Sequence, residues 1–505
     1  MEIAFEKGEV WWGGASAGRC CPLKETDCYT EDLIDGSTSA SNQSMPLFVS
    51  SHGRYIWSSG PFSVTARDGA FRFEGARPEA KKAGTCLREA YLTAQREHFP
   101  CDGRDLPEVF FTAPQLNTWM EYGHDVTQRG VLDLARGWID GGYAPGVLIV
   151  DDGWQENCGE WEFGRAAFPD PGAMVRQLHE WGFKVLLWVV PYVSADGPEH
   201  GRRGLRARSG ETAVFSWWNG TGALLDMRSE DDRAFLRSRL DRLMREYGID
   251  GFKFDGGSVR GYSPSSLVNA PLAEPAAAVD LNRAWNEFGA AYEYHEFKDT
   301  YGRGGRNTIQ RLRDKRHLWQ RGGLNDLIPC ALNAGLMGYP FLCPDMIGGG
   351  ERRDLLTPGF RLDEELFVRM AQCSALFPMM QFSRAPWRAL DKENARLCLE
   401  AARLHERMLP EIMRAVRASL RTGEPVVRPL EYECPHHGFD QVTDEFVLGS
   451  DLLAAPVLEK GAQAREVAFP EGTWRGMDGR EYAGLTRQTV SAPLDTLPWF
   501  RRVGP

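Results

Sequence analysis

Segments that would carry the chain to or through a membrane are missing from the 505 residues. The opening stretch, MEIAFEKGEVWW, has no basic n-region and no apolar h-region, so no signal peptide is predicted. The longest apolar run, residues 185–193, is far too short to span a bilayer. We therefore expect a cytoplasmic protein without a membrane partner, although a chain already freed of its signal would show the same pattern.

A disulfide framework is also missing. The eleven cysteines are odd in number and lack regular spacing, which argues against a set of structural disulfides. Cys20, Cys21 and Cys28 lie close together in sequence, but no matching Cys/His pair completes a zinc site. Reduced thiols are the expected state.

Several catalytic signatures are absent as well. The ten histidines form no His-x-His or His-Glu-x-x-His pattern, and His436-His437 follows the predicted catalytic region. Gly302–Gly305 and Gly348–Gly350 lack the strand–loop–helix context of a phosphate loop. We expect no metal and no cofactor, with a metal-dependent barrel hydrolase as an open alternative. The net charge of −11 disfavours nucleic acid as a partner.

What the chain does contain is enough apolar sequence for two or three domains, since 505 residues exceed one ordinary core. Residues 1–108 carry short apolar runs broken by Gly, Ser, Pro and Asp, which predicts an N-terminal β-sandwich. Residues 109–417 alternate between strand and helix patterns, which predicts an α/β domain of the (β/α)₈ barrel type. Strand-like runs return in residues 418–505, which predicts a C-terminal β-sandwich domain.

Within the barrel region the predicted elements fall into two sets. The expected strands are Leu116–Tyr122, Gly146–Asp152, Lys184–Val190, Ala223–Asp226, Phe252–Asp255, Tyr292–Phe297, Thr308–Asp314 and Phe341–Ile347. The expected helices are Val131–Ile139, Ala173–Trp181, Ser229–Tyr247 and Leu324–Leu336. The clearest is the third, with Ser229 as a capping residue and Gly248 as its stop.

The stretch Gly251–Gly257 is the most informative one. Side chains alternate along a strand, so Phe252 and Phe254 share one face while Lys253 and Asp255 share the other. Charged side chains on an inward face are costly in an ordinary core, but they suit the C-terminal end of a barrel strand, where chemistry takes place. We predict that Asp255 is a catalytic carboxylate, followed by two glycines that allow a sharp turn beside a ligand.

Acidic residues recur at the ends of the predicted strands, and in a barrel these ends converge on one mouth. The acids are Asp151, Asp152, Asp226, Asp255, Asp314 and Asp345. Each one alone is more often a helix cap or a loop carboxylate, but the set suits two chemistries, metal catalysis and glycosidic-bond hydrolysis. Because the histidines of a typical metal site are missing, hydrolysis by a carboxylate pair is the better fit.

The sequence resembles glycoside hydrolase family 31 from about Asn117 to the C-terminus, and within it the myogenesis-regulating glycosidase group, which is α-galactosidase-like. Matching stretches are Thr118-Trp119, Tyr122-Gly123, Asp125-Val126, Trp217–Gly220, Phe252–Asp255, Arg311–Asp314 with Trp319, Leu327–Pro329, Gly338–Phe341, Pro344–Gly349, Met380–Ser383, Pro386-Trp387, Val427–Leu430 and Leu453–Val457. The ordered set of matches is specific, whereas each match alone is weak.

The resemblance implies a retaining mechanism with Asp255 as nucleophile and Asp314 as acid/base. The residue before Asp314 is Arg313, where the family has glycine. For donation of a proton we expect the pKa of Asp314 to be raised by burial or by negative charge. Lys253 is expected to stabilise ionised Asp255 or to serve as a structural ion-pair partner.

The resemblance also implies the residues that bind substrate. Asp151 and Asp152 would hold the distant hydroxyls of the terminal sugar, and Arg311 would contact hydroxyls or steady a carboxylate. Trp188 and Trp218 would form walls of the subsite, with core packing as the alternative. Trp319 and Asp345 complete the expected substrate-binding set through the motifs that contain them.

The expected substrate is a small oligosaccharide or α-glycoside cleaved at its terminal sugar. Many α-glucosidases of the family have a sugar-binding histidine late in the barrel, and Met380–Ser383 contains none, which favours α-galactose. The alternatives are an α-glucosidase or other α-glycosidase of the family and, less favoured, a non-catalytic sugar-binding protein. The sequence leaves oligomeric state open, a homo-oligomer included.

Overall fold

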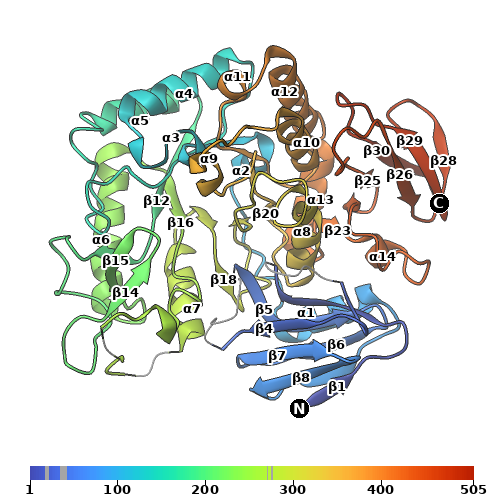
Figure 1. Cartoon of the computed structure of the whole chain (residues 1–505), viewed down its shortest axis with the longest axis horizontal. Coiled ribbons are helices and arrows are strands. Elements are labelled where there is room, and N and C mark those ends of the chain that lie inside the picture. Colours follow the sequence, from blue (N-terminus) through green and yellow to red (C-terminus); the bar gives the residue numbers. More distant parts are fainter. Residues whose placement is uncertain (17–21, 35–41, 270, 275–276, 505) are drawn as a thin grey trace.

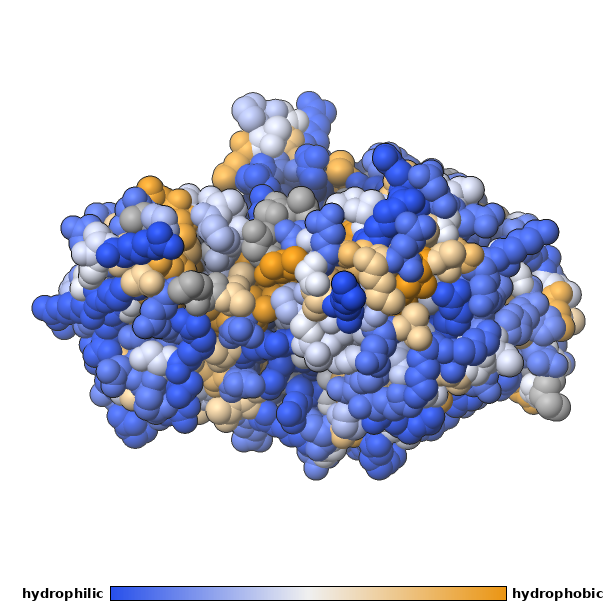
Figure 2. All heavy atoms as spheres, turned by 90° about the horizontal axis from the view of Figure 1, so that it is seen from below, coloured by the Kyte–Doolittle hydropathy of each residue, from blue (hydrophilic) through white to orange (hydrophobic). Residues whose placement is uncertain are grey.

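The structure is a computed structural model that describes residues 1–16, 22–34, 42–269, 271–274 and 277–504, so Cys20 and Cys21 lie outside it. Figure 1 shows two N-terminal sheets in blue below a central barrel, with the C-terminal sheets in red at one side. None of the helices in the described ranges is both long and apolar enough to cross a membrane. The face seen in Figure 2 is mostly hydrophilic, with apolar side chains in small patches.

The central domain is a closed parallel barrel, as predicted. In sheet order its segments are β20 (Leu342–Cys343), β19 (Gln310–Arg311), β17 (Tyr294–Phe297), β16 (Gly251–Phe254), β12 (Lys184–Val189), β11 (Val147–Val150), β10 (Gln115–Asn117), β22 (Gln381–Phe382) and β21 (Met346–Ile347). All neighbouring pairs are parallel. Because only two residues separate β20 from β21, these two segments act as one strand and close the ring.

Helices cover the outside of the barrel (Figure 1). The longer ones are α4 (Gln128–Asp140), α5 (Pro171–Glu180), α6 (Glu230–Tyr247), α7 (Ala278–Gly289), α8 (Leu327–Leu336), α10 (Glu364–Ser374), α12 (Lys392–Arg407) and α13 (Leu409–Thr422). The short ones are α2 (Val109–Thr112), α3 (Trp119–Tyr122), η1 (Gly123–Asp125), η2 (Pro264–Ser266), η3 (Leu324–Asp326), α9 (Arg353–Leu356) and α11 (Pro386–Ala389). The predicted boundary at residue 417 falls within α13.

The helix α6 shows how closely local sequence sets an element. Leu236, Leu240 and Leu243 form its buried stripe, at the spacing of one helical face. Gly248 ends it at φ +80°, a left-handed conformation that glycine adopts without strain. Ser229 occupies the N-cap position as predicted, but its side chain makes no capping hydrogen bond.

Two predicted strands are wrong in part. Leu116–Tyr122 is a strand only as far as Asn117, because the Asn117 side chain accepts a hydrogen bond from the Trp119 amide at 2.7 Å and turns the chain into α3. Ala223–Asp226 overlaps β15 (Gly220–Leu224), which belongs to a separate antiparallel sheet with β13 (Tyr192–Ser194) and β14 (Val214–Trp217). A tight hairpin between β14 and β15 gives this segment a local partner in place of the barrel.

The N-terminal domain is a two-sheet β-domain, as predicted. One sheet contains β1 (Glu2–Ala4), β8 (Ala70–Gly75), β7 (Phe62–Arg67) and β4 (Tyr29–Asp32); the other contains β3 (Leu23–Lys24), β2 (Val10–Ala15), β5 (Gln43–Ser50), β6 (Arg54–Trp57) and β9 (Glu79–Lys82). The sheets pack through aromatic rings, with the Phe48 and Phe71 centroids 4.8 Å apart. The helix α1 (Leu87–His98) follows.

This domain also contacts the barrel mouth. The segment after β17 contains no helix; instead β18 (Thr300–Tyr301) pairs in parallel with β5 of the N-terminal domain. Asn42 and Gln43 both donate side-chain hydrogen bonds to the Lys298 carbonyl, at 2.9 and 3.0 Å. The N-terminal domain thereby holds the backbone that leaves β17.

The C-terminal domain is also antiparallel. Its larger sheet contains β23 (Val427–Arg428), β24 (Phe446–Leu448), β25 (Leu452–Ala454), β30 (Trp499–Gly504), β27 (Thr473–Gly476) and β28 (Glu481–Ala483); its smaller one contains β26 (Ala464–Phe469) and β29 (Thr486–Ser491). The short helix α14 (Leu430–Glu433) lies between β23 and β24. Phe469 and Phe500 join the two sheets, with ring centroids 4.8 Å apart.

Candidate active site

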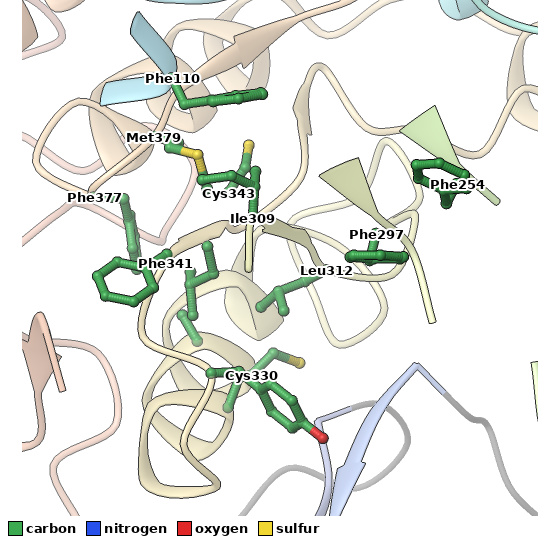
Figure 3. Close-up of a cluster of buried hydrophobic side chains, with 14 of the residues drawn as sticks. Phe110, Phe254, Phe297, Ile309, Leu312, Cys330, Phe341, Cys343, Phe377 and Met379 are labelled. Carbon is green, nitrogen blue, oxygen red and sulfur yellow. The ribbon is translucent and has the colours of Figure 1, made fainter. Parts of the chain in front are cut away.

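The strand β16 carries the predicted catalytic acid at its C-terminal end, and its side chains alternate as the sequence indicated. Phe254 stacks on Phe297 of the neighbouring strand at 5.4 Å between centroids, in the cluster of buried side chains shown in Figure 3. Phe254 also meets Trp285 of α7 edge-on at 5.2 Å, so the aromatic face of β16 points toward the covering helices. Lys253 therefore projects into the barrel interior, at 2% exposure.

Lys253 is held by Asp151, the acid that follows β11. The Lys253 Nζ lies 2.6 Å from Asp151 Oδ2, and both side chains are buried. Asn117, at the end of β10, donates to the same oxygen at 2.7 Å. The backbone amide of Asp152 donates to the other Asp151 oxygen at 2.9 Å. Asp151 is thus fully engaged with protein groups, and Lys253 makes the structural ion pair that the sequence allowed.

Asp255 is only partly buried and remains reachable, with a side chain 14% exposed. The Trp188 indole donates to Oδ2 at 3.0 Å, and the Gly256 amide donates to Oδ1 at 2.7 Å. Burial opposes ionisation of this carboxyl, but Lys298, Lys253 and Arg311 outweigh it and lower the pKa of Asp255 below its usual value. The charged form of a potential nucleophile is therefore favoured.

The turn after Asp255 leads to an aromatic wall. Gly256 and Gly257 have φ angles of +59° and +61°, which explains the pair of glycines at this position. A Cβ at Gly256 would lie 3.5 Å from the Trp218 ring, so Trp218 leans over this turn. Trp218 is 56% exposed, which excludes core packing as its role. Trp188 is buried at 1% exposure and reaches the site through its indole NH.

Two further aromatic rings support Trp218. Tyr192 of β13 stacks on Trp217 with 4.5 Å between centroids and 3° between planes. Trp217 in turn meets Trp218 edge-on at 5.2 Å. The antiparallel sheet inserted after β12 thus builds an aromatic rim beside Asp255. The family resemblance implied Trp218 as a wall residue, whereas Tyr192 was not predicted.

Asp152 points toward a different set of partners from Asp151. Its Oδ2 accepts a hydrogen bond from Asn219 at 2.7 Å and lies 3.1 Å from His124 Nε2. The hydrogen bond to Asp152 is the main cause of a raised pKa at His124. Asn219 and His124 are therefore candidate site residues that the sequence analysis did not predict. Both lie in or beside stretches that match the family.

Asp314 is the centre of a second cluster, which lies after β17 and β19. Lys298 Nζ lies 2.6 Å from Oδ2, and Arg311 forms an ion pair with Oδ1. Burial favours the neutral form of this carboxyl, but the charges of Arg311 and Lys298 prevail and hold the pKa of Asp314 far below its usual value. The expected upward shift at Asp314 is therefore wrong for this arrangement, because two buried cations pair with the carboxylate.

Arg311 is fixed in turn by Asp345. The Arg311 Nη1 lies 3.3 Å from Asp345 Oδ1, and each of the two side chains is 1% exposed. Asp345 Oδ2 accepts backbone hydrogen bonds from Lys315 at 2.7 Å and from Gly350 at 3.2 Å. Burial raises the pKa of Asp345 to about 6. In this structure Arg311 steadies carboxylates, and Asp345 orients Arg311.

Two more acids lie at the end of β17 and were not predicted as site residues. Glu296 is buried inside the barrel, where Gln381 donates to it at 2.9 Å, and burial raises its pKa. Asp299 directly follows Lys298 and is nine-tenths buried. Burial and the negative charge of Asp255 raise the pKa of Asp299 to about 8. The predicted strand over Tyr292–Phe297 could have pointed to the residues just beyond its end.

Two predicted residues lie apart from these clusters. The Trp319 indole donates to Asp363 Oδ2 at 2.9 Å, and Lys460 of the C-terminal domain lies 2.6 Å from the same oxygen. Asp226, which the strand pattern had placed among the converging acids, forms a surface ion pair with Arg228 at 2.8 Å instead. The hairpin sheet explains the displacement of Asp226.

Within the described residues one group of side chains has the spacing of a metal site, and it lies in the N-terminal domain. Glu6, Glu9 and His52 bring their ligand atoms within 4.8 Å of one another. Arg54 already compensates this group, at 3.4 Å from Glu6 and 3.0 Å from Glu9. In the barrel, Asp151, Asp314 and Asp345 form ion pairs with Lys253, Lys298 and Arg311.

Comparison with known families identifies the barrel and the C-terminal domain. Residues 106–318 match the TIM-barrel domain of glycosyl hydrolases family 31, and residues 423–505 match the C-terminal domain of the same family. This chain belongs to glycoside hydrolase family 31.

Individual relatives agree with this assignment. The myogenesis-regulating glycosidase of mouse is 32% identical over 413 residues, which are 79% of this chain and 57% of that protein. The 1,3-alpha-isomaltosidase of Kribbella flavida is 25% identical over 72% of this chain and 54% of its own length. The chain thus spans little more than half the length of these relatives. The predicted resemblance to the myogenesis-regulating glycosidase group is confirmed.

A solved structure shows the same fold. The dextranase of Flavobacterium johnsoniae, a family 31 protein complexed with glucose, superposes with a TM-score of 0.82 over 99% of this chain and 66% of its own. Its sequence is 20% identical to this chain. All three parts of the chain therefore fit one known architecture.

Proposed function

We propose that this chain is a retaining, exo-acting α-glycoside hydrolase that releases terminal α-galactose. The observation that carries the proposal is Asp255, a partly buried carboxylate at the C-terminal end of a barrel strand whose pKa three nearby cations lower. Such a group is poised to attack an anomeric carbon and form a covalent glycosyl-enzyme. Membership of a family of glycosidases supports the same reading.

The residues around Asp255 suit the recognition of one sugar ring. Trp218 offers an exposed aromatic face, and the polar groups of Asp152, His124 and Asn219 lie together beside it in the loops after β10, β11 and β14. Lys253 and Asp151 lie below them in the barrel. We assign Asp152 to the hydroxyls of the terminal sugar and Asp151 to the support of Lys253.

For the second carboxyl group the family resemblance points to Asp314. In a retaining mechanism this group protonates the departing oxygen and then deprotonates the incoming water. For Asp314 to take that part, Lys298 or Arg311 must withdraw from it when substrate binds, since both pair with it in this structure.

α-Galactose is favoured by the Met380–Ser383 segment, which contains no histidine, and by the likeness to the myogenesis-regulating glycosidase group. Structural neighbours solved with glucose or isomaltose favour the alternative, an α-glucosidase. The proposed partner is a small oligosaccharide or α-glycoside. We also propose a cytoplasmic location, which agrees with buried free thiols at Cys343, Cys373 and Cys398.

The deciding experiment is a panel of nitrophenyl α-glycosides that includes galactoside, glucoside and xyloside, with NMR detection of the anomer released first. We expect turnover of the α-galactoside with initial release of the α-anomer. Preference for the glucoside would replace galactose by glucose. Binding of sugars without turnover of any glycoside would contradict the proposal, and loss of activity on chelation would favour a metal-dependent hydrolase.

A further inference from the structure

The N-terminal domain meets the barrel at the end of β17, on the side of the mouth that holds Asp314. The segment from β17 to β19 contains no helix, and within it β18 lies beside β5 as a parallel partner (Figure 1). The Gly302 amide, directly after β18, donates to the Ser44 carbonyl of β5 at 2.9 Å. Each strand of such a barrel is usually followed by a helix, so here a strand pair between two domains takes that place.

Gln43, the first residue of β5, is the fully buried side chain at this junction. Its Oε1 accepts a hydrogen bond from Ser16 at 3.1 Å, which fixes the orientation of the amide. Its Nε2 donates to the Lys298 carbonyl at 3.0 Å, to Gln310 Oε1 at 3.1 Å and, more weakly, to the Arg311 carbonyl at 3.4 Å. One side chain of the N-terminal domain therefore joins the end of β17 to β19.

Other hydrogen bonds hold the same two strand ends together. Asn42 donates a second hydrogen bond to the Lys298 carbonyl, at 2.9 Å. Thr300 Oγ1 donates to Gln310 Oε1 at 3.0 Å, so that oxygen accepts from both β5 and β18. Gln310 Nε2 in turn donates to Thr308 at 2.9 Å. Gln43 is thus the centre of a buried amide network rather than an isolated contact.

The backbone held by this network carries the two cations of the Asp314 cluster. The carbonyls that Gln43 contacts belong to Lys298 and Arg311. The side chains of these two residues bind the two oxygens of Asp314, one each. A misplacement of about 1 Å in a reacting group can cost on the order of 100-fold in rate. On the basis of the proposed function, we infer that Gln43 is a positioning residue for Asp314 and acts through the two cations that hold this carboxyl.

The nucleophile does not depend on Gln43 in the same way. Asp255 has its own hydrogen bonds, from the Trp188 indole at 3.0 Å and from the Gly256 amide at 2.7 Å. Loss of Gln43 should therefore impair proton transfer to the leaving group more than attack on the anomeric carbon. Substrates that differ in their need for a proton separate the two effects.

The test compares Gln43→Leu with the wild type on a natural disaccharide and on a dinitrophenyl α-glycoside, whose leaving group needs no proton. We expect kcat/KM on the disaccharide to fall by about 10-fold or more, and kcat/KM on the dinitrophenyl glycoside to stay within about 3-fold. Equal losses on the two substrates would overturn the inference.

A double variant gives a second readout that a general structural role would not produce. If Gln43 acts through Asp314, Gln43→Leu should have little further effect on the disaccharide in the Asp314→Asn background, because residues that act as one unit are not additive. A further loss of the same size as in the wild-type background would overturn the inference.

The matched control lies in the same interface between the two domains. Asn333 of α8 is fully buried, accepts from the Gly13 amide at 2.8 Å and donates to the Ala15 carbonyl at 2.9 Å. Asn333→Ala should lower Tm, as Gln43→Leu should, but it should leave the ratio of the two kcat/KM values at its wild-type level. The same change of this ratio in both variants would overturn the inference.

A milder variant keeps the test available where Gln43→Leu fails to fold. Thr300→Val retains the shape of the side chain and removes one donor to Gln310. It should lower kcat/KM on the disaccharide selectively, by about 5-fold, the scale of one neutral hydrogen bond. An unchanged ratio of the two kcat/KM values in a folded Thr300→Val would overturn the inference.

Failure of the inference and failure of the proposed function give different results. A selective loss on the disaccharide in Asp314→Asn without one in Gln43→Leu overturns the inference alone. Equal losses on both substrates in Asp314→Asn overturn its acid/base role, and the inference with it. A wild type inactive on every glycoside overturns the proposed function as a whole.

Discussion

The acidic side chains on the two sides of the barrel mouth differ in their ion-pair and hydrogen-bond partners. On the β11 side, formed by Asn117, Asp151, Asp152 and Lys253, each acid has close partners, and Lys253 pairs with Asp151 at 2.6 Å. On the β19 side, formed by Lys298, Asp299, Arg311, Asp314 and Asp345, two acids, Asp314 and Asp345, share the cations Lys298 and Arg311. Asp255 lies between the two sides, and cations from both sides lower its pKa.

The difference shows how one barrel mouth can shift the pKa values of its carboxyl groups in opposite directions. Nearby cations lower the pKa of Asp255 and of Asp314, although desolvation opposes the ionisation of both. Burial and the negative charge of Asp255 raise the pKa of Asp299, which has no ion-pair partner among the described residues. The β11 side therefore forms a rigid frame, whereas on the β19 side burial raises the pKa of Asp299 and Asp345.

The largest effect is expected at the residue between the two sides. Asp255→Asn removes the proposed nucleophile, so kcat should fall by roughly 10⁴-fold or more, because covalent catalysis is lost. The fold should persist, which near-ultraviolet circular dichroism would show. Substantial residual activity on an aryl α-glycoside would contradict the nucleophile assignment.

Breaking the frame should cost stability. Lys253→Met leaves the Asp151 carboxylate buried without its cation, and we expect the free energy of unfolding to drop by about 3–5 kcal/mol in denaturant titration. The control is Arg72→Met, whose exposed pair with Glu2 should contribute less than about 1 kcal/mol. Equal, small losses in both variants would mean that the β11 side is not rigidly held by this pair.

A smaller effect on rate is expected from Trp188→Phe, which removes the indole NH that donates to Asp255. A hydrogen bond to a charged group contributes about 1.5 kcal/mol or more, so kcat/KM should fall about 10-fold. Trp474→Phe removes a comparable buried bond, to Pro470, in the C-terminal domain and should leave kcat/KM unchanged. Similar kinetics in both variants would count against a role for Trp188 at Asp255.

The smallest effect concerns stability on the β19 side. In the unfolded chain Asp299 ionises near pH 3.8, whereas in the folded protein it keeps its proton to about pH 8, so the folded state loses stability as pH rises between these values. Asp299→Asn removes this loss and should raise Tm by a few degrees at pH 7. At pH 3 the two proteins should melt alike. A lower Tm for the variant than for the wild type at pH 7 would contradict a raised pKa of Asp299 in the folded protein.

Much of this frame could be predicted from the sequence. The alternation in Phe252–Asp255 placed Lys253 inside and the phenylalanines outside, and the apolar runs before Asp151 and Asp255 located two barrel strands. Periodicity fails where a local partner competes. Asn117 turns its strand into α3, and the hairpin after Trp217 removes Ala223–Asp226 from the barrel.

The β19 side was harder to predict because its chemistry depends on distances between strands. Asp314 was recognisable by its place before Trp319, but nothing in the sequence shows that Lys298 and Arg311 both reach it. Asp299 follows a predicted strand, yet its unpaired state depends on where the neighbouring cations point. Sequence patterns locate strand ends, whereas protonation states follow from the packing of these ends.

The central claim, that Asp255 attacks the sugar, is tested most directly by trapping the covalent intermediate. A 5-fluoro-α-glycosyl fluoride of the preferred sugar forms a glycosyl-enzyme that breaks down slowly, and peptide mass spectrometry locates the label. We expect one sugar per chain, attached to Asp255 in the peptide that contains Phe252–Gly257. A label on Asp314, on Asp299 or on any other carboxylate of an active enzyme would contradict the account.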